Sequence, residues 1–201
     1  MDRWAKAGFP LRHREKLEAA AKSRQGAPSG WHLDRQGQQK AAREAAWAAL
    51  QPRGGCVLLL GPRGTGKTQL AVELALQAAR IGLEDFIGAQ SYRVLNELFR
   101  AEKRTFGGDR EAVRKTPIDE ACAVDLLVLD EIQERFESEW EDRELTMLFD
   151  RRYREVRRTI LVANLALHEA PQRLPASMWS RLVECATVLE CTWPSFRTAG
   201  R

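Results

Sequence analysis

Short apolar runs separated by longer amphipathic stretches dominate the pattern of hydrophobic and polar positions along this chain. Apolar runs of this length, bounded by turn residues, are typical of strands buried in a sheet. We expect strands at residues 56–60, 85–89, 124–129, 159–163 and 187–191.

The stretches between these runs carry apolar residues at helical spacing, so helices are expected at residues 36–50, 69–80, 91–102 and 139–158. The last of these helices would bury one face of its surface. That face carries Leu145, Leu148, Phe149, Tyr153 and Val156. The alternation of strands with helices predicts an α/β domain with a parallel sheet and helices on both faces.

A basic, helical arm at residues 1–50 is expected ahead of a main domain at residues 51–201. At 201 residues and 44% hydrophobic composition, the chain can bury one good core but falls short of two full-sized domains. Residues 1–55 hold 11 Lys and Arg against 5 Asp and Glu. A basic flank of this kind can contact nucleic acid or an acidic partner surface, or it can simply be a solvated face.

Two further observations concern compartment and redox state. No stretch approaches the roughly 18 uninterrupted apolar residues of a membrane span, and the N-terminus lacks the apolar run of a signal peptide. We therefore expect a cytoplasmic protein with no membrane partner. The cysteines at 56, 122, 185 and 191 form no C-x-x-C pair, so they are interpreted as reduced core thiols without a disulfide or a zinc site.

The loop after the first strand matches the pattern G-x-x-x-x-G-K-[ST], with a buried strand before it and a helix after it. Its residues are Gly61, Pro62, Arg63, Gly64, Thr65, Gly66, Lys67 and Thr68. Glycines allow the positive φ angles of a phosphate cradle, and the next helix presents its N-terminus to the anion. Lys67 is expected to reach the β- and γ-phosphates, and the Thr68 hydroxyl to ligate Mg²⁺. The loop thus predicts a site for ATP and Mg²⁺.

The third expected strand ends in two carboxylates, Asp130 and Glu131. This is the Walker B arrangement, in which a strand beside the phosphate-binding loop delivers acidic groups to the same phosphate. Asp130 would hold Mg²⁺, directly or through water, and Glu131 would polarise the water that attacks the γ-phosphate. The adjacent pair favours an ATP hydrolase over a small P-loop kinase.

The fourth expected strand ends in Asn164. An Asn at that strand tip can hydrogen-bond both the γ-phosphate and the attacking water, although an Asn after a strand is also a common turn residue. Before this strand lies an arginine cluster, Arg151, Arg152, Arg154, Arg157 and Arg158. The cluster either complements a helix C-terminus or forms a phosphate-contacting patch for DNA.

With these residues assembled, the chain resembles an AAA+ ATPase of the DnaC/IstB type, the helicase loaders and transposition helpers. The resemblance covers residues 54–197 and includes Arg152-Tyr153, Ser180-Arg181-Leu182 and Trp193-Pro194-Ser195-Phe196-Arg197. It also extends to residues 7–12, which are similar to the segment ahead of the ATPase core in loaders. The resemblance implies a P-loop NTPase fold, the AAA+ core, with a five-stranded parallel sheet in the order 5-1-4-3-2 and no lid domain.

The resemblance also implies a function and partners. Arg181 would be the arginine finger that reaches a neighbouring subunit's ATP, so the protein would form an ATP-dependent oligomer. We expect a phage-type helicase loader that acts on single-stranded DNA and a hexameric replicative helicase. The alternative is a transposition helper that binds duplex DNA and a transposase. The short arm departs from the larger helicase-binding domain that loaders usually carry.

Overall fold

The computed structural model describes residues 6–13, 15, 38–81, 90–106, 115–134 and 138–196. Its strands are β1 (Cys56–Leu60), β2 (Gln90–Val94), β3 (Leu126–Asp130), β4 (Arg158–Val162) and β5 (Ala186–Glu190). Its helices are α3 (Gln38–Leu50), α4 (Lys67–Ile81), α5 (Leu95–Phe106), α6 (Pro117–Ala123), α7 (Glu139–Arg154), α8 (Ala170–Arg173) and α9 (Ala176–Cys185). These elements alternate along the chain as the hydrophobic pattern predicted.

The five strands form one sheet in the order β2-β3-β4-β1-β5, in which every pairing is parallel. Read from the other edge, this is the predicted order 5-1-4-3-2, so the predicted P-loop NTPase topology is confirmed. The phosphate-loop strand β1 lies between β4 and β5, and the Walker B strand β3 lies between β2 and β4. The carboxyl ends of parallel strands meet at one edge of the sheet, which is where ligands bind in open α/β folds.

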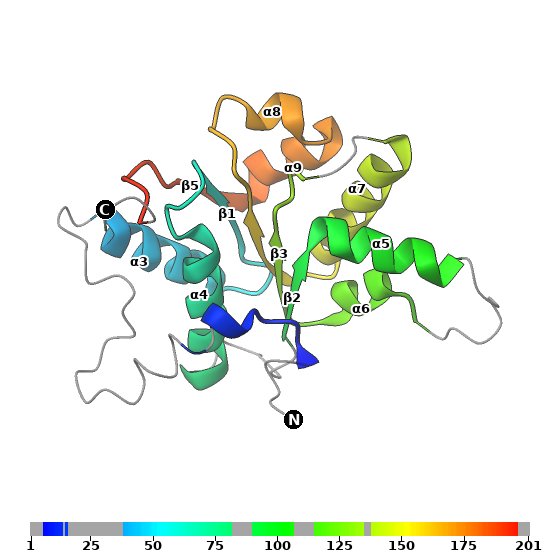
Figure 1. The fold of residues 1–201 in the computed structure, drawn as a ribbon, viewed down its shortest axis with the longest axis horizontal. Helices are drawn as coiled ribbons and strands as arrows, with labels where there is room; N and C mark the ends of the chain where they lie inside the picture. The colour runs from blue at the N-terminus through cyan, green and yellow to red at the C-terminus, as the bar shows by residue number, and fades with distance from the viewer. Residues whose placement is uncertain are drawn as a thin grey trace.

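Helices cover both faces of the sheet (Figure 1), and a hydrophobic core lies beneath each layer of helices. Because successive side chains on a strand point to opposite faces, Leu58 and Leu60 belong to one core and Val57 and Leu59 to the other. The first core is closed by α5, α6, α7 and α9. The second is closed by α3 and α4. The central strands are therefore buried on both faces, which explains their continuous apolar runs.

The segment around residue 92 differs from the prediction. Residues 91–102 were expected to be one helix, but residues 90–94 form strand β2 and α5 begins only at Leu95. The strand is stabilised by its register with β3, in which Tyr92 pairs with Val128 and Val94 with Asp130. Tertiary pairing has overridden a local helical pattern here. The predicted strand at residues 85–89 lies outside the described residues.

The end of α7 also differs from the prediction. The helix ends at Arg154 rather than at residue 158, because the chain must reverse before β4 begins. Val156 takes a positive φ of 55° in this turn, an uncommon conformation for a β-branched residue. Leu145, Leu148 and Phe149 are buried as predicted, whereas Tyr153 and Val156 are 39% and 47% exposed. The buried face thus stops one turn earlier than expected.

The described parts of the arm pack on the main domain. Ala46 and Leu50 of α3 are fully buried in the second core, and Phe9 is 2% exposed in the same cluster. The division into an arm at residues 1–50 and a domain at residues 51–201 stays a prediction. None of the described helices has the length and apolar character needed to cross a bilayer.

Candidate functional site

The phosphate-binding loop has the backbone that its glycines predicted. Gly61, Gly64 and Gly66 all have positive φ angles, of 130°, 90° and 85°. A Cβ at residue 61 would collide with the carbonyl of Cys191, which follows β5, so only glycine fits between the two strand ends. The helix α4 begins at Lys67, directly after the loop. The N–H groups of its first turn and its dipole favour an anion at this position.

The side chain of Lys67 folds back onto the start of the phosphate-binding loop. Its side chain is buried, with the residue only 4% exposed. The ammonium donates to the carbonyls of Gly61 and Pro62, each at 2.7 Å from Nζ. The charge is therefore held inside the cradle and not directed into solvent. A polyphosphate entering the loop would meet this cation together with the N-terminus of α4.

Asp130 connects the loop to the end of β3. Its Oδ2 accepts a hydrogen bond from the Thr68 hydroxyl at 2.8 Å, and its Oδ1 accepts the backbone N–H of Glu131 at 2.8 Å. The predicted metal-binding pair is thus brought together, from positions 62 residues apart in sequence. Hydroxyl and carboxylate oxygens are the hard donors that Mg²⁺ prefers, alongside water and phosphate oxygens. These two residues therefore fit Mg²⁺.

Tyr92 is a site residue that sequence reasoning missed. Its hydroxyl donates to the same Oδ2 of Asp130 at 2.6 Å. Burial, followed by the charge of Asp130, raises the pKa of the Tyr92 hydroxyl well above its usual range, so the hydroxyl stays a donor. Tyr92 lies two positions before Val94, the residue of β2 that pairs with Asp130. Finding Tyr92 from the sequence would have required a correct prediction of strand β2.

Glu131 follows Asp130 in a strained position, with a φ of 56°. Burial raises the pKa of its carboxyl above the ordinary value, and the charges of Asp130 and Glu134 raise it further. Glu134 in turn pairs with Arg63 of the loop at 2.6 Å. Glu131, which is proposed to polarise water, therefore lies near two other carboxylates, and Arg63 partly neutralises their charge.

Gln133 joins the third and fourth strand ends. Its Oε1 accepts the backbone N–H of Asn164 at 2.9 Å, and the N–H of Ile132 donates to the carbonyl of Val162. Asn164 therefore lies at the same edge of the sheet as the Walker B residues. Its role toward a bound nucleotide stays a prediction. Gln133 itself was not singled out in the sequence, because a Gln after a strand has no motif.

Arg181 lies on α9 and is held by contacts within the chain. Its Nε is 3.2 Å from Asp150 Oδ1, and its Nη1 donates to the carbonyl of Ser177 at 3.2 Å. The side chain is 38% exposed, so it is open to solvent as a finger toward a neighbour requires. The proposed role in a second subunit's site is not tested by these contacts.

The segment after β5 forms hydrogen bonds with the phosphate-binding loop. The indole N–H of Trp193 donates to the carbonyl of Thr65 at 2.8 Å, and the backbone N–H of Phe196 donates to the carbonyl of Gly64 at 2.9 Å. Trp193 is 6% exposed. These bonds fix the carbonyls of Gly64 and Thr65 in the loop.

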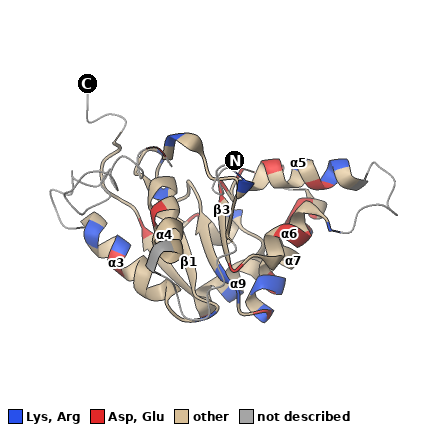
Figure 2. Ribbon diagram, turned by 90° about the horizontal axis from the view of Figure 1, so that it is seen from below, with Lys and Arg blue, Asp and Glu red and all other residues tan. Residues whose placement is uncertain are grey.

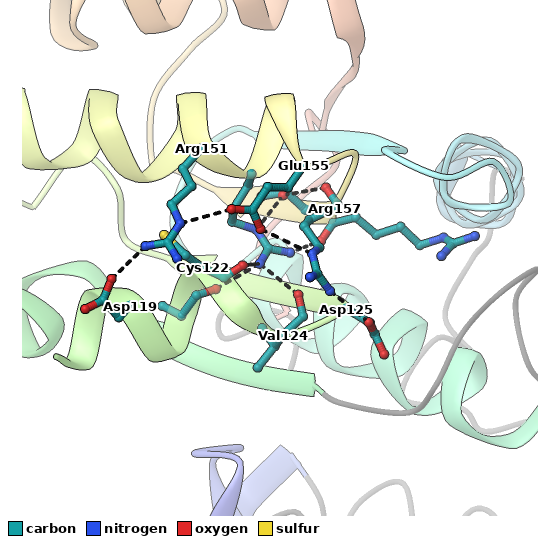
Figure 3. Close-up of polar contacts among 11 residues, drawn as sticks. Asp119, Cys122, Val124, Asp125, Arg151, Glu155 and Arg157 are labelled. Atoms are coloured by element: carbon teal, nitrogen blue, oxygen red, sulfur yellow. Dashed lines mark hydrogen bonds and ion pairs between the residues drawn. The ribbon is translucent and has the colours of Figure 1, made fainter. Parts of the chain in front are cut away.

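Four of the five arginines of the cluster take part in a structural network, and contact of the cluster with DNA stays a prediction. Figure 3 shows ion pairs that link Asp119 to Arg151 at 2.6 Å and Arg157 to Asp125 at 3.2 Å, with Glu155 between the two arginines. Two further arginines of the cluster, at 152 and 158, are buried. These four arginines are therefore paired or enclosed within the chain, whereas Arg154 is exposed.

Arg152 is the centre of this network. It is fully buried and donates to Thr159 Oγ1 and to four carbonyls, those of Ala121, Cys122, Val124 and Arg158. Burial lowers its pKa to about 10, which leaves the guanidinium charged at neutral pH. It therefore fastens α7 to the end of α6 and to the start of β4, the strand that precedes Asn164.

The family model described as IstB-like ATP binding protein matches residues 18–201. Comparison with curated protein sequences gave no significant match.

Among solved structures, the DnaC helicase loader aligns with a TM-score of 0.65 at 21% identity, over 81% of this chain and 94% of that one. DnaI aligns with a TM-score of 0.65 at 22% identity, over 88% and 93%. The replication initiator DnaA bound to AMPPCP and single-stranded DNA gives 0.60 at 18% identity, over 76% of this chain but only 44% of that one. At these identities the matches show a shared fold, whereas the family model covers most of the sequence. The chain therefore belongs to the family of IstB-like ATP-binding proteins, as its resemblance to AAA+ ATPases of the DnaC/IstB type predicted.

Proposed function

We propose that this protein binds and hydrolyses ATP in DNA replication, as a phage-type helicase loader that acts on single-stranded DNA and a hexameric replicative helicase. The observation that carries the proposal is the hydrogen bond between Thr68 and Asp130, with Glu131 next in the chain. It joins the phosphate loop to a strand end that carries a metal-binding and a water-polarising carboxylate. The likeness to the DnaC helicase loader and to DnaI supports the replication role.

Each residue of the site has a separate task in this proposal. The loop N–H groups and Lys67 bind the β- and γ-phosphates and orient them for in-line attack. Thr68 and Asp130 would hold Mg²⁺, which neutralises phosphate charge when bound. Glu131 accepts a proton from the attacking water, and Asn164 orients that water. Arg181 is proposed to reach the ATP of a neighbouring subunit in an ATP-dependent oligomer.

DNA contact is assigned to the basic arm at residues 1–50, which includes α3, and to the arginine cluster at residues 151–158. Figure 2 shows basic positions on α3 and acidic positions on α6. Lys40 and Arg43 are the basic residues of α3. A contact through such residues is electrostatic and falls steeply with salt.

The nucleotide proposal predicts different defects at two positions. Lys67→Ala should lose ATP binding, because the buried cation of the cradle is removed. Glu131→Gln should bind ATP normally but hydrolyse it about 10²- to 10⁴-fold more slowly, because only the water-polarising group is lost. Binding of a fluorescent ATP analogue and phosphate release measure the two steps separately.

Glu44→Gln on α3 is the matched control, because it removes an exposed carboxylate away from the strand ends. It should leave both measurements unchanged. Wild-type hydrolysis by Glu131→Gln would show that another group polarises the water.

The second candidate function is a transposition helper that binds duplex DNA and a transposase. The match to the IstB-like ATP-binding family favours it, because that family description is not specific to loaders. The two candidates share the ATP site and differ in the DNA and protein partner. A small P-loop kinase is the weaker alternative, because the adjacent carboxylates Asp130 and Glu131 are suited to water as the acceptor.

A further inference from the structure

One carboxylate oxygen of Asp130 accepts hydrogen bonds from two hydroxyl groups. The Thr68 hydroxyl donates to Oδ2 from the phosphate-loop helix, and the Tyr92 hydroxyl donates to it from the edge strand β2. The bond from Tyr92 is the shorter of the two, at 2.6 Å against 2.8 Å. Hydrogen bonds from a hydroxyl to a carboxylate are charge-assisted and have a well-defined geometry. Tyr92 is therefore part of the support of Asp130.

The ring of Tyr92 is held firmly behind that hydroxyl. The residue is 6% exposed and belongs to the second core. Its ring packs against Phe9 with the ring centroids 5.8 Å apart. Because the ring is buried and closely packed, the hydroxyl has little room to move away from Asp130.

The segment that contributes Phe9 is fastened to the backbone of the same tyrosine. The N–H of Tyr92 donates to the carbonyl of Ala7 at 2.8 Å. Gly8 has a φ of 86°, and a Cβ there would collide with the Tyr92 carbonyl. Residues 7–9 therefore cover the exposed edge of β2 at the residue whose side chain reaches Asp130.

We propose that Tyr92 is a positioning residue that holds Asp130 in place for Mg²⁺, and that Phe9 acts through Tyr92. The inference rests on the proposed ATP site. Asp130 must keep accepting from Thr68 so that the hydroxyl oxygen of Thr68 stays directed at the metal. Mutation of a group that hydrogen-bonds a metal-binding residue typically lowers metal affinity 10- to 100-fold. Because Thr68 and Glu131 still hold Asp130 when Tyr92 is changed, a loss of about 3- to 10-fold is expected.

The test compares the two tyrosines of the chain. Tyr92→Phe removes the hydroxyl and keeps the ring against Phe9. Tyr153→Phe is the matched control, because its hydroxyl donates to Glu184 on the surface. The probe is a fluorescent ATP analogue, titrated with MgCl₂ at fixed nucleotide. Tyr92→Phe should raise the half-saturating Mg²⁺ concentration about 3- to 10-fold and leave metal-free nucleotide binding unchanged, whereas Tyr153→Phe should change neither.

Phe9 is tested by a double-mutant cycle. Phe9→Leu keeps an apolar side chain in the core and should raise the half-saturating Mg²⁺ concentration in the same direction by a smaller factor. In the Tyr92→Phe background it should have no further effect, since the hydroxyl through which it acts is gone. Independent effects of the two substitutions would overturn the role of Phe9.

The outcomes separate this inference from the proposed function. An unchanged or lower half-saturating Mg²⁺ concentration in Tyr92→Phe, with normal binding by the wild type, would overturn the positioning role alone. A wild-type protein that binds no nucleotide at any Mg²⁺ concentration would overturn the ATP site and the inference together. Circular dichroism and thermal unfolding of each variant identify a general folding defect, which would affect metal-free binding as well.

Discussion

Arg152 is the largest side chain that the described part of the chain buries completely. A buried guanidinium is stabilised only when its donors are satisfied, and here the hydroxyl of Thr159 and four backbone carbonyls accept from it. Its acceptors lie at the end of α6, before β3 and at the start of β4. One arginine thus fixes the entry of two strands whose other ends carry Asp130 and Asn164.

This arrangement predicts that Arg152 contributes to stability rather than to nucleotide or DNA binding. Arg152→Ala should lower the free energy of unfolding by about 3–5 kcal/mol, because it leaves several buried carbonyls without a donor and opens a cavity. Arg152→Lys should recover part of the loss, since an ammonium has three donors but no planar fork. Urea denaturation monitored by circular dichroism measures both.

Arg154→Ala is the matched control, because Arg154 is an exposed arginine on the same helix. It should change the free energy of unfolding by less than about 0.5 kcal/mol. An Arg152→Ala protein as stable as the wild type would show that the network in Figure 3 is dispensable.

Single residues of the site differ in how far the sequence reveals them. Lys67, Thr68, Asp130 and Glu131 belong to patterns whose spacing is imposed by phosphate and metal chemistry, and Thr68 and Asp130 were predicted to meet. Tyr92, Gln133 and Arg152 act through contacts between distant segments. The local sequence around these residues does not indicate those contacts.

At the scale of elements, the three buried strands and the edge strand β5 were predictable, and the edge strand β2 was not. β1, β3 and β4 are buried on both faces, so their apolar runs identify them. β2 is an edge strand with the sequence Gln-Ser-Tyr-Arg-Val, which has no such run. Its identity depends on pairing with β3 and on coverage by residues 7–9, and both are tertiary effects.

The basic end of α7 shows the same limit at its boundary. A dense run of arginines suits a helix C-terminus and a DNA surface equally well when only the sequence is considered. In the structure, α6 presents Asp119 to Arg151, and β3 is preceded by Asp125, which pairs with Arg157. This pairing across elements is not encoded in the local sequence, and a DNA contact through the cluster stays a prediction.

At the scale of the whole molecule, we propose that a second copy completes the site. Arg181 is on α9, and its exposed guanidinium is positioned on the domain surface by Asp150. A trans arginine stabilises charge on the transferring phosphoryl group, with effects of about 10³- to 10⁵-fold in well-studied NTPases. An isolated subunit should therefore hydrolyse ATP very slowly.

Mixing two inactive variants tests this sharing. Lys67→Ala keeps Arg181 to offer, and Arg181→Ala keeps a site that binds ATP. Their mixture should recover part of the wild-type hydrolysis rate per subunit, whereas each variant alone should stay inactive. A mixture as inactive as its components, under conditions where the wild type is active, would return Arg181 to the role of a surface ion pair with Asp150.

Retention of a hexameric replicative helicase by this chain tests the proposed function as an ATP-dependent helicase loader most directly. The tagged chain is incubated with a hexameric replicative helicase or with a transposase, in the presence of ATP or ADP, and Lys67→Ala is used as the nucleotide-free control. The account predicts that the helicase is retained with ATP, that retention falls with ADP and in Lys67→Ala, and that the transposase is not retained. Retention of the transposase, or helicase binding that is identical in all nucleotide states, would contradict it.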